Sequence, residues 1–444
     1  MATSTMDSGG DHTIDIESLV SSLERRLSAN LVMSSNFSIF RIPTILARHN
    51  KTSYEPNAFA IGPFHHNNPL LQPTERIKQK YLRDLLSRLP NNPNRPNSPD
   101  TMLIRKFTKA ISDIHSDARG YYAGAIDMKA NDFVDMLLLD GCFIIELFRK
   151  NAYQSDLIDK EDPIFTMSCL LQFLHHDLIL LENQIPWLVL DILFNLTKTP
   201  IDQKSLAQLA MDFFPSLLRN KALRLDSSSA DIQKSRHILD LYRNSLTSKS
   251  GVRQESKHDW QHIRAATGLR DSGIKFEVNT TAESVLDISF IPKRGVMSIP
   301  PLLIQETTET VFRNLISLEQ CCPNYKPIIT CYAVLLDNLI DTSADIQVLE
   351  KNKVIDNWLN VDDATKFFNR LYIDTYVKEN YYYDLTSEVN RYCRKHWHKY
   401  QRILKRDYFK HPWAFISVIA ACVALILTFL QTFYAIQDSY KKDN

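Results

Sequence analysis

The chain has 444 residues, and its 52 Lys and Arg against 51 Asp and Glu leave a formal net charge of +1. Hydrophobic residues make up 44% and charged residues 23%, a composition that is typical of globular proteins and excludes a wholly disordered chain. Only 10 residues are glycine, well below the usual frequency of roughly 7%. This scarcity argues against turn-rich β architectures and against enzymes built on glycine phosphate loops.

Helical periodicity dominates the first part of the chain. Apolar residues at three-to-four spacing predict helices over 14–33, 74–89, 101–119, 129–150, 163–185 and 186–198. The helix over 129–150 is apolar nearly all round, so we expect it in the core. Prolines and asparagines predict a surface loop at 89–100. A polar stretch at 227–258 predicts a loop or mobile insertion with one helical patch at 237–246.

From about residue 274 the apolar residues change from helical spacing to the two-residue alternation of β-strands. IKFEV (274–278) and VLDISF (285–290) alternate, and GVMSIPPLLI (295–304) supplies a third short strand. Helical patterns return over 306–320, 328–341, 344–359, 361–379 and 380–406. The predicted fold is therefore α+β: a predominantly α-helical globular domain with a small β element near 274–304.

An apolar run near the C-terminus predicts one transmembrane helix at 413–435. Residues 413–437 carry no charge, and 22 residues of helix are roughly 33 Å long, enough to cross a bilayer core of about 30 Å. Trp413 and Tyr434 lie where interfacial anchors are expected. The alternative is a buried core helix, which at this length normally shows a polar face.

The flanks of this run predict its orientation. Residues 391–412 hold eight Lys or Arg and one acid, and this basic side is assigned to the cytosol. We therefore expect a single-pass, tail-anchored protein with most of the chain cytosolic, in the plasma membrane rather than the endoplasmic reticulum. Anionic lipid headgroups are expected to bind the basic segment 391–410, with Lys405, Arg406 and Lys410 at the membrane interface.

Several phrases of the sequence resemble one plant family. They include IFRIPTILARHNKTSYEPNAFAIGPFHH, MLLLDGCFIIELFR, DLILLENQIPWLVLDILF, IPPLLIQETTETVFRNLISLEQC and RDYFKHPWAFISVIAACVALILTFLQTFYA. In this order they are similar to the family known only as domain of unknown function 247, over about residues 36–436. The resemblance implies a plant protein with a C-terminal membrane anchor, and it transfers no functional residue.

These patterns divide the chain into four parts. An N-terminal segment with an amphipathic helix covers 1–35, and the family domain covers 36–410 with its loop at 89–100 and its insertion at 227–258. The transmembrane helix at 413–435 and a short tail at 436–444 follow.

The sequence lacks the motifs of common enzymes. No GxxxxGK[ST], GxGxxG, GxSxG or HExxH occurs, so we expect no cofactor. No metal site is expected, because the adjacent histidines of His65-His66 and His175-His176 point about 100° apart on a helix. The balanced charge predicts no nucleic-acid partner.

Acidic side chains in apolar helices are the weak catalytic candidates. They are Asp140, Glu146, Asp177 and Glu182, together with His175. Buried carboxylates suit a general acid or a metal, but pairing with Arg or Lys such as Arg149 is the commoner cause.

Two functions follow from these patterns. The first is a membrane-anchored, non-enzymatic protein-recognition or scaffold module with an unknown protein partner. The alternative is a hydrolase that uses the carboxylates and histidines of 135–182 with His65 or His66. Convergence of these side chains in one open pocket would favour the hydrolase, whereas internal pairing would favour the recognition module.

Overall fold

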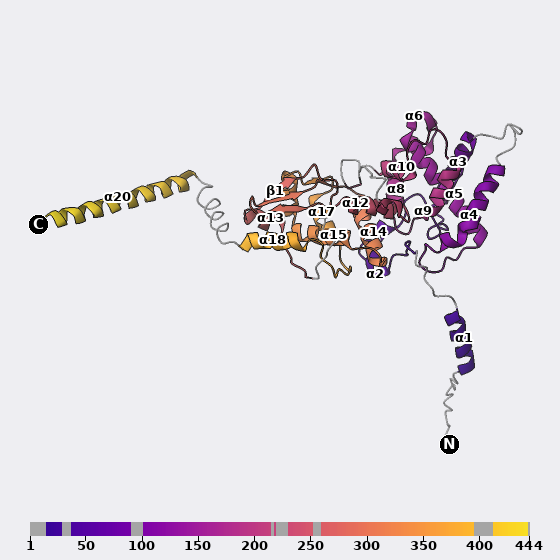
Figure 1. Cartoon of the computed structure of the whole chain (residues 1–444), viewed down its shortest axis with the longest axis horizontal. Helices are drawn as coiled ribbons and strands as arrows, with labels where there is room; N and C mark the ends of the chain where they lie inside the picture. The colour runs from indigo at the N-terminus through magenta and orange to yellow at the C-terminus, as the bar shows by residue number, and fades with distance from the viewer. Residues whose placement is uncertain are drawn as a thin grey trace, which may run out of the picture.

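A computed structural model describes residues 15–28, 37–89, 101–214, 217–218, 230–251, 259–394 and 412–442. The helices and strands form an elongated body, and two helices lie apart from it, namely α1 (Ile16–Ser28) near the N-terminus and α20 (Pro412–Lys442) near the C-terminus (Figure 1). Four apolar residues of α1 are exposed, namely Ile16, Leu19, Val20 and Leu23. The predicted amphipathic helix is thus confirmed over the described residues, but its apolar face does not pack in the core.

The first half of the body is organised around α5 (Ala130–Ala152), which is buried almost throughout from Phe133 to Lys150. Its central position follows from its sequence, which is apolar nearly all round. Gly141 lets α9 approach closely, because a Cβ there would lie 2.5 Å from Leu193 Cδ1. The elements of this half are α2 (Thr44–Ala47), the 3-10 helix η1 (Lys51–Tyr54), α3 (Gln72–Arg88), α4 (Thr101–Arg119), α5, α6 (Gln154–Leu157), α7 (Pro163–Thr166), α8 (Ser168–Asp177), α9 (Trp187–Leu196) and α10 (Leu206–Phe213).

The second half combines helices with two small sheets. In the first sheet β3 (Val296–Ile299) lies between β1 (Lys275–Val278), which runs parallel to it, and β2 (Ser289–Ile291), which runs antiparallel. In the second, β4 (Leu302–Ile304) pairs in parallel with β5 (Ile355–Asn357). The helices are α11 (Ala230–Gln233), α12 (Ile238–Thr247), α13 (Ala266–Asp271), α14 (Thr308–Cys321), α15 (Ile328–Leu339), α16 (Ser343–Lys351), α17 (Val361–Phe368) and α18 (Tyr383–Arg394).

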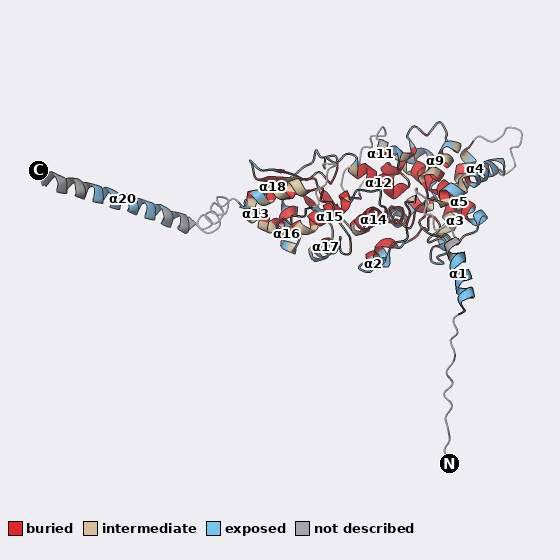
Figure 2. Ribbon diagram, turned by 60° about the horizontal axis from the view of Figure 1, so that its bottom comes forward, coloured by how far each residue is buried: buried red, intermediate tan, exposed pale blue. Residues whose placement is uncertain are grey.

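The helix α12 joins the two halves, because it packs against both α10 and α14. Residues 238–246 of this helix are all buried, so the helical patch predicted at 237–246 within the loop or insertion at 227–258 is part of the core (Figure 2). Its polar side chains are buried at low cost because they are paired: Arg243 contacts Glu319 at 3.0 Å, and His237 caps the helix by accepting a hydrogen bond from Asp240 N. Residues 252–258 lie outside the described residues.

Several predicted helices are shorter than the pattern suggested. The chain leaves the helix after Asp177, because the Gln184 side chain donates hydrogen bonds to the carbonyl oxygens of Leu178 and Leu180 and closes a turn. The predicted helix over 344–359 ends at Lys351 and is followed by β5, with Lys353 at a positive φ of 59°. Apolar residues that alternate over only three positions are too short a signal to separate a strand from the end of a helix.

The predicted transmembrane helix at 413–435 is wrong. These residues are helical, as part of α20. A bilayer-spanning helix needs about 20 consecutive, predominantly apolar residues. Across the part of the chain that the structure describes, no helix meets both the length and the apolar character that a membrane crossing requires. The α-rich α+β domain is confirmed, whereas residues 90–100 of the predicted loop at 89–100 and the segment 395–411 lie outside the described residues.

Candidate functional site

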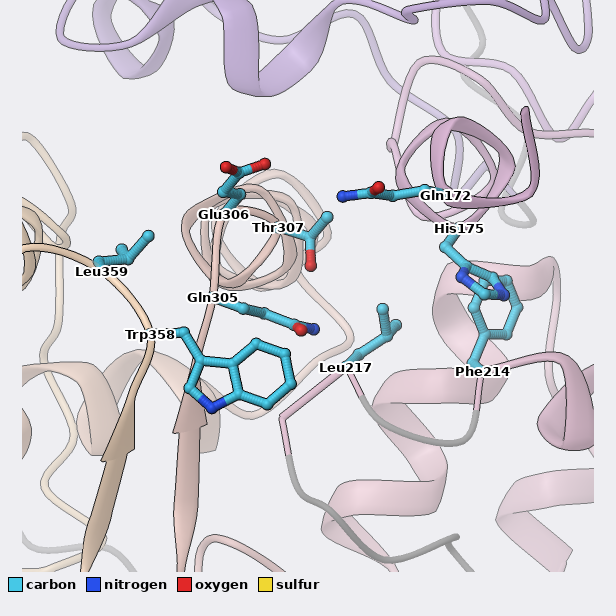
Figure 3. Close-up of a pocket in the computed structure, with 9 residues that line it drawn as sticks. All are labelled: Gln172, His175, Phe214, Leu217, Gln305, Glu306, Thr307, Trp358 and Leu359. Atoms are coloured by element: carbon cyan, nitrogen blue, oxygen red, sulfur yellow. The ribbon is translucent and has the colours of Figure 1, made fainter. Parts of the chain in front are cut away.

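A cleft of about 650 Å³ lies between the two halves of the body (Figure 3). One wall comes from α8 and the residues after α10, and the other from the β4–α14 connection and the residues after β5. Its lining residues are Gln172, His175, Phe214, Leu217, Gln305, Glu306, Thr307, Trp358 and Leu359. A pocket of this size and mixed polarity, placed between two structural units, is where ligand sites commonly occur.

The two-stranded sheet positions the wall that carries Trp358. Leu302, Leu303 and Ile304 of β4 are paired in register with β5, and Trp358 N extends the ladder by donating to Ile304 O at 2.9 Å. On the opposite side, Leu303 N donates to Leu218 O at 3.0 Å, which ties β4 to the segment after α10. The three-residue strand β4 therefore holds both walls of the cleft at a defined spacing.

Trp358 is the most conspicuous side chain of the cleft, since 67% of it is exposed. Its Nε1–H donates to Asp356 Oδ1 at 3.2 Å, which fixes the orientation of the indole. Figure 3 places this ring on one side of the cleft and Phe214 with His175 on the other, with Gln305 and Leu217 between them. A large aromatic side chain that is oriented but not covered is typical of a binding anchor.

The opposite wall combines the rings of His175 and Phe214 with the amide of Gln172. The His175 ring packs against Phe213 with centroids 4.6 Å apart and lies 6.2 Å from that of Phe214. Burial lowers the pKa of His175 to about 4, so its imidazole is neutral at physiological pH. Among the lining residues that the structure describes there is neither Lys nor Arg, and the carboxylate is that of Glu306.

The start of α14 places a polar group in the cleft. Thr307 is the residue before α14, and its side chain does not cap the helix. Its Oγ1 is buried and has no hydrogen-bond partner among the described residues. A buried hydroxyl without a partner is costly, so a bound group that pairs with it after a small rearrangement would be stabilised.

The weak catalytic candidates do not meet in this cleft, apart from His175. Asp140 is paired with Lys78 at 2.6 Å and accepts a hydrogen bond from Gly62 N at 2.8 Å. Glu146 forms two hydrogen bonds with the guanidinium of Arg88. Both carboxylates are fully buried and serve to join α5 to α3 and to the segment around 60.

The other two carboxylates also anchor the irregular N-terminal segment. Asp177 accepts hydrogen bonds from the backbone N–H groups of residues 57–59, at 2.7 to 2.8 Å. Glu182 accepts one from Ile42 N at 2.5 Å and lies 3.6 Å from His65 Nε2. Burial raises the pKa of Glu182 and lowers that of His65 to about 4. The pattern therefore matches internal pairing, the outcome that favours the recognition module.

The remaining predictions concern metal binding and the membrane interface. In the part of the chain that is described, no group of three His, Cys, Asp or Glu is placed to hold a metal ion. Lys405, Arg406 and Lys410 lie outside the described residues, and Trp413 and Tyr434 are positions of α20. No sequence pattern predicted the cleft. Its walls come from four segments between residues 172 and 359, and none of these segments has a local pattern that indicates a binding site.

Fold and site together define a single-cored, helix-rich α+β protein with an open cleft between its halves. The family model described as a plant protein of unknown function, DUF247, matches residues 39–427, and the chain belongs to this family. It is 27% identical over 431 residues to the UPF0481 protein At3g47200 of Arabidopsis thaliana, covering 91% of this chain and 87% of that protein. A second Arabidopsis thaliana UPF0481 protein, At3g02645, is 21% identical over 97% of this chain and 96% of its own length. No solved structure matches the chain.

Proposed function

We propose that the protein is a recognition module that binds a peptide segment of a partner protein in the cleft at Trp358. The observation that carries this proposal is the exposure of an oriented indole at the mouth of a preformed cleft. Tryptophan is enriched among residues that dominate the free energy of protein–protein binding, because it buries a large area and loses little conformational freedom.

The chemistry of the cleft defines the peptide it accepts. Trp358, Phe214 and Leu217 offer an apolar surface for one large apolar side chain. The amides of Gln172 and Gln305 lie on opposite walls, in reach of a peptide backbone that passes between them. This lining suits an extended segment, whose backbone needs hydrogen-bond partners along its length.

Charge adds a second element of specificity. Glu306 is exposed at the cleft and takes part in no ion pair within the described residues, and Asp356 lies next to the indole. Because His175 is neutral, Glu306 makes the described lining of the cleft negative, with no Lys or Arg among those lining residues. The partner segment therefore carries a Lys or Arg beside its apolar anchor, which steers the encounter and selects against acidic peptides.

Selection from a random peptide library displayed on phage, followed by fluorescence polarisation with synthetic peptides, tests this proposal. We expect enriched peptides that share a large apolar residue next to Lys or Arg. Trp358→Ala should weaken their binding about 30-fold, which corresponds to the roughly 2 kcal/mol of a hot-spot residue. Glu306→Gln should weaken the same peptides less, and the loss should shrink as salt is added.

The matched control is Tyr376→Ala, which removes another aromatic side chain that is 77% exposed but lies outside the cleft. Its peptide affinity should equal that of the unmodified protein. Failure to enrich any peptide, or enriched peptides that bind Trp358→Ala with full affinity, would show that this cleft is not a peptide site.

A further inference from the structure

A second cavity, of about 440 Å³, lies between the irregular segment 63–68 and the connection from α4 to α5. Its described lining does not overlap with that of the cleft at Trp358. One cation, one anion, three other polar side chains and four apolar side chains share this lining, namely Arg41, Asp127, His65, Asn67, Asn68, Pro63, Phe64, Ala125 and Ile126. The volume is within the range of small-molecule pockets.

Hydrogen bonds fix both walls of this cavity. On one wall, Asn68 N donates to His65 O at 3.0 Å, and Asn68 Oδ1 accepts from Leu70 N at 3.0 Å, which closes the turn 65–68. On the other wall, the Arg119 guanidinium donates to Ile126 O at 3.0 Å. A ligand would therefore meet a preformed site, and its binding would order little that is not already ordered.

Arg41 is the cation of the cavity, and its guanidinium is oriented but accessible. The guanidinium carbon lies 4.6 Å from the centroid of the Phe64 ring, which itself packs edge-on against Tyr122 with 5.6 Å between centroids. Arg41 Nη1 lies 3.9 Å from Glu182 Oε2, which is longer than a hydrogen bond, and 65% of the Arg41 side chain is exposed. Its planar N–H groups can therefore meet a carboxylate, whose geometry they match.

The other polar groups of the cavity complement this cation. Asp127 lies on the other wall, where it is exposed. Burial and the nearby charge of Arg41 lower the pKa of His65 to about 4, so its imidazole is neutral near pH 7. Its Nε2 is buried and has no hydrogen-bond partner among the described residues. A polar atom in this state is costly, so a ligand group that pairs with it after a small rearrangement would be stabilised.

We propose that this cavity binds a free α-amino acid with an apolar side chain. Arg41 pairs with the carboxylate of this zwitterion and Asp127 with its ammonium group, and both contacts are charge-assisted hydrogen bonds. The apolar side chain of the ligand packs against Phe64 and Ile126. The lining suits a zwitterion rather than an ion of one sign, because Arg41 attracts an anion that Asp127 repels, and the reverse holds for a cation.

Isothermal titration calorimetry on the full chain at low salt tests the proposal with two amino acids, leucine and phenylalanine, and two analogues of leucine. Isocaproate keeps the side chain and the carboxylate of leucine but lacks the ammonium group, whereas isoamylamine keeps the side chain and the ammonium group but lacks the carboxylate. We expect leucine to bind about tenfold more tightly than either analogue, because each analogue loses one charge-assisted hydrogen bond. An analogue that binds as tightly as leucine would contradict recognition of a zwitterion.

Substitutions of the two exposed charged residues assign each charge of the ligand to its partner. Arg41→Gln should weaken the binding of leucine about tenfold and leave that of isoamylamine unchanged, since this analogue has no carboxylate. Asp127→Asn should weaken leucine by a similar factor and leave isocaproate unchanged. The matched controls are Arg105→Gln and Asp113→Asn, because both residues are exposed on α4 and lie outside the described lining. Both controls should bind leucine with unchanged affinity.

Two results would overturn the proposal. One is the absence of binding by both leucine and phenylalanine, and the other is equal affinity for leucine in the two cavity variants and the two controls. Neither result bears on peptide binding, which is measured at the cleft of Trp358.

Discussion

The buried ion pair between Lys78 and Asp140 is expected to make a large contribution to stability. Both side chains are almost fully inaccessible, at 0% and 2%, and Lys78 Nζ also contacts Ala60 O and Glu75 Oε1. The ammonium group therefore has three acceptors in a site that water does not reach. Burial alone would lower the pKa of Lys78, but the attraction of Asp140 and Glu75 for the ammonium group is larger and raises the pKa overall. Lys78 is therefore charged in the folded protein.

Replacing Lys78 with Met removes these three interactions and keeps most of the side-chain volume. Asp140 then has to stay charged without its cation or take up a proton, and Ala60 O loses its donor. Removal of one partner from a buried pair costs about 3–5 kcal/mol. We expect the free energy of unfolding of Lys78→Met, measured by urea denaturation with far-UV circular dichroism, to fall by this amount.

The control applies the same substitution to an exposed pair. Lys366 and Asp363 are 3.3 Å apart on α17, with 65% and 67% of their side chains exposed. Lys366→Met should change the free energy of unfolding by no more than about 0.5 kcal/mol, because such pairs are screened by water. Equal losses for the two variants would refute the argument that burial makes the Lys78 pair important. The double variant Lys78→Met/Asp140→Leu should recover part of the loss, since it leaves no unpaired charge.

Two further predictions concern pH and backbone strain. Burial lowers the pKa of His237 to about 4 in the folded protein, below its value near 6.5 in the unfolded chain. Between these two pH values the unfolded chain binds a proton that the folded protein does not. The free energy of unfolding therefore falls as the pH drops from about 6.5 to 4. Urea midpoints over this range should fall less steeply for His237→Gln than for the unmodified protein, while His262→Gln, an exposed control, should follow the unmodified curve. Gly62 has a φ of +75°, and a Cβ there would lie 2.4 Å from Gln184 O, whereas Gly124 has a φ of +92° with nothing within 4 Å. In both alanine variants the positive φ destabilises the protein by about 1–2 kcal/mol. A larger loss of thermal stability for Gly62→Ala than for Gly124→Ala therefore measures the clash of the new Cβ with Gln184 O. Equal losses would contradict this clash.

Sequence patterns located the long helices of the first half to within a few residues. The predictions over 74–89, 101–119 and 129–150 correspond to α3, α4 and α5. These helices are long and strongly periodic, so the local signal is sufficient. The predictions failed where a short element depends on a distant partner. The strand β5, for example, exists because β4 lies beside it, some fifty residues earlier in the chain.

The candidate carboxylates illustrate a related limit. Their burial was evident from the apolar helices around them, and pairing with Lys or Arg was the explanation that the sequence favoured. Their actual partners were not identifiable, since Lys78 and Arg88 pair with residues about sixty positions away. Arg149, the partner suggested by proximity in sequence, is instead paired with Asp202 at 2.8 Å. Helical periodicity gives the face of a residue but not the element packed against that face.

The sequence by itself determined the helical class of the protein, its central core helix and its family, since these depend on local periodicity and on phrases along the chain. Only the tertiary structure decided that residues 238–246 of α12 are core, that the buried carboxylates are paired with distant segments, and that Trp358 stands at a cleft. Each of these depends on contacts between segments far apart in the chain. For the 413–435 segment, length and missing charges predicted a membrane helix that the described structure does not bear out.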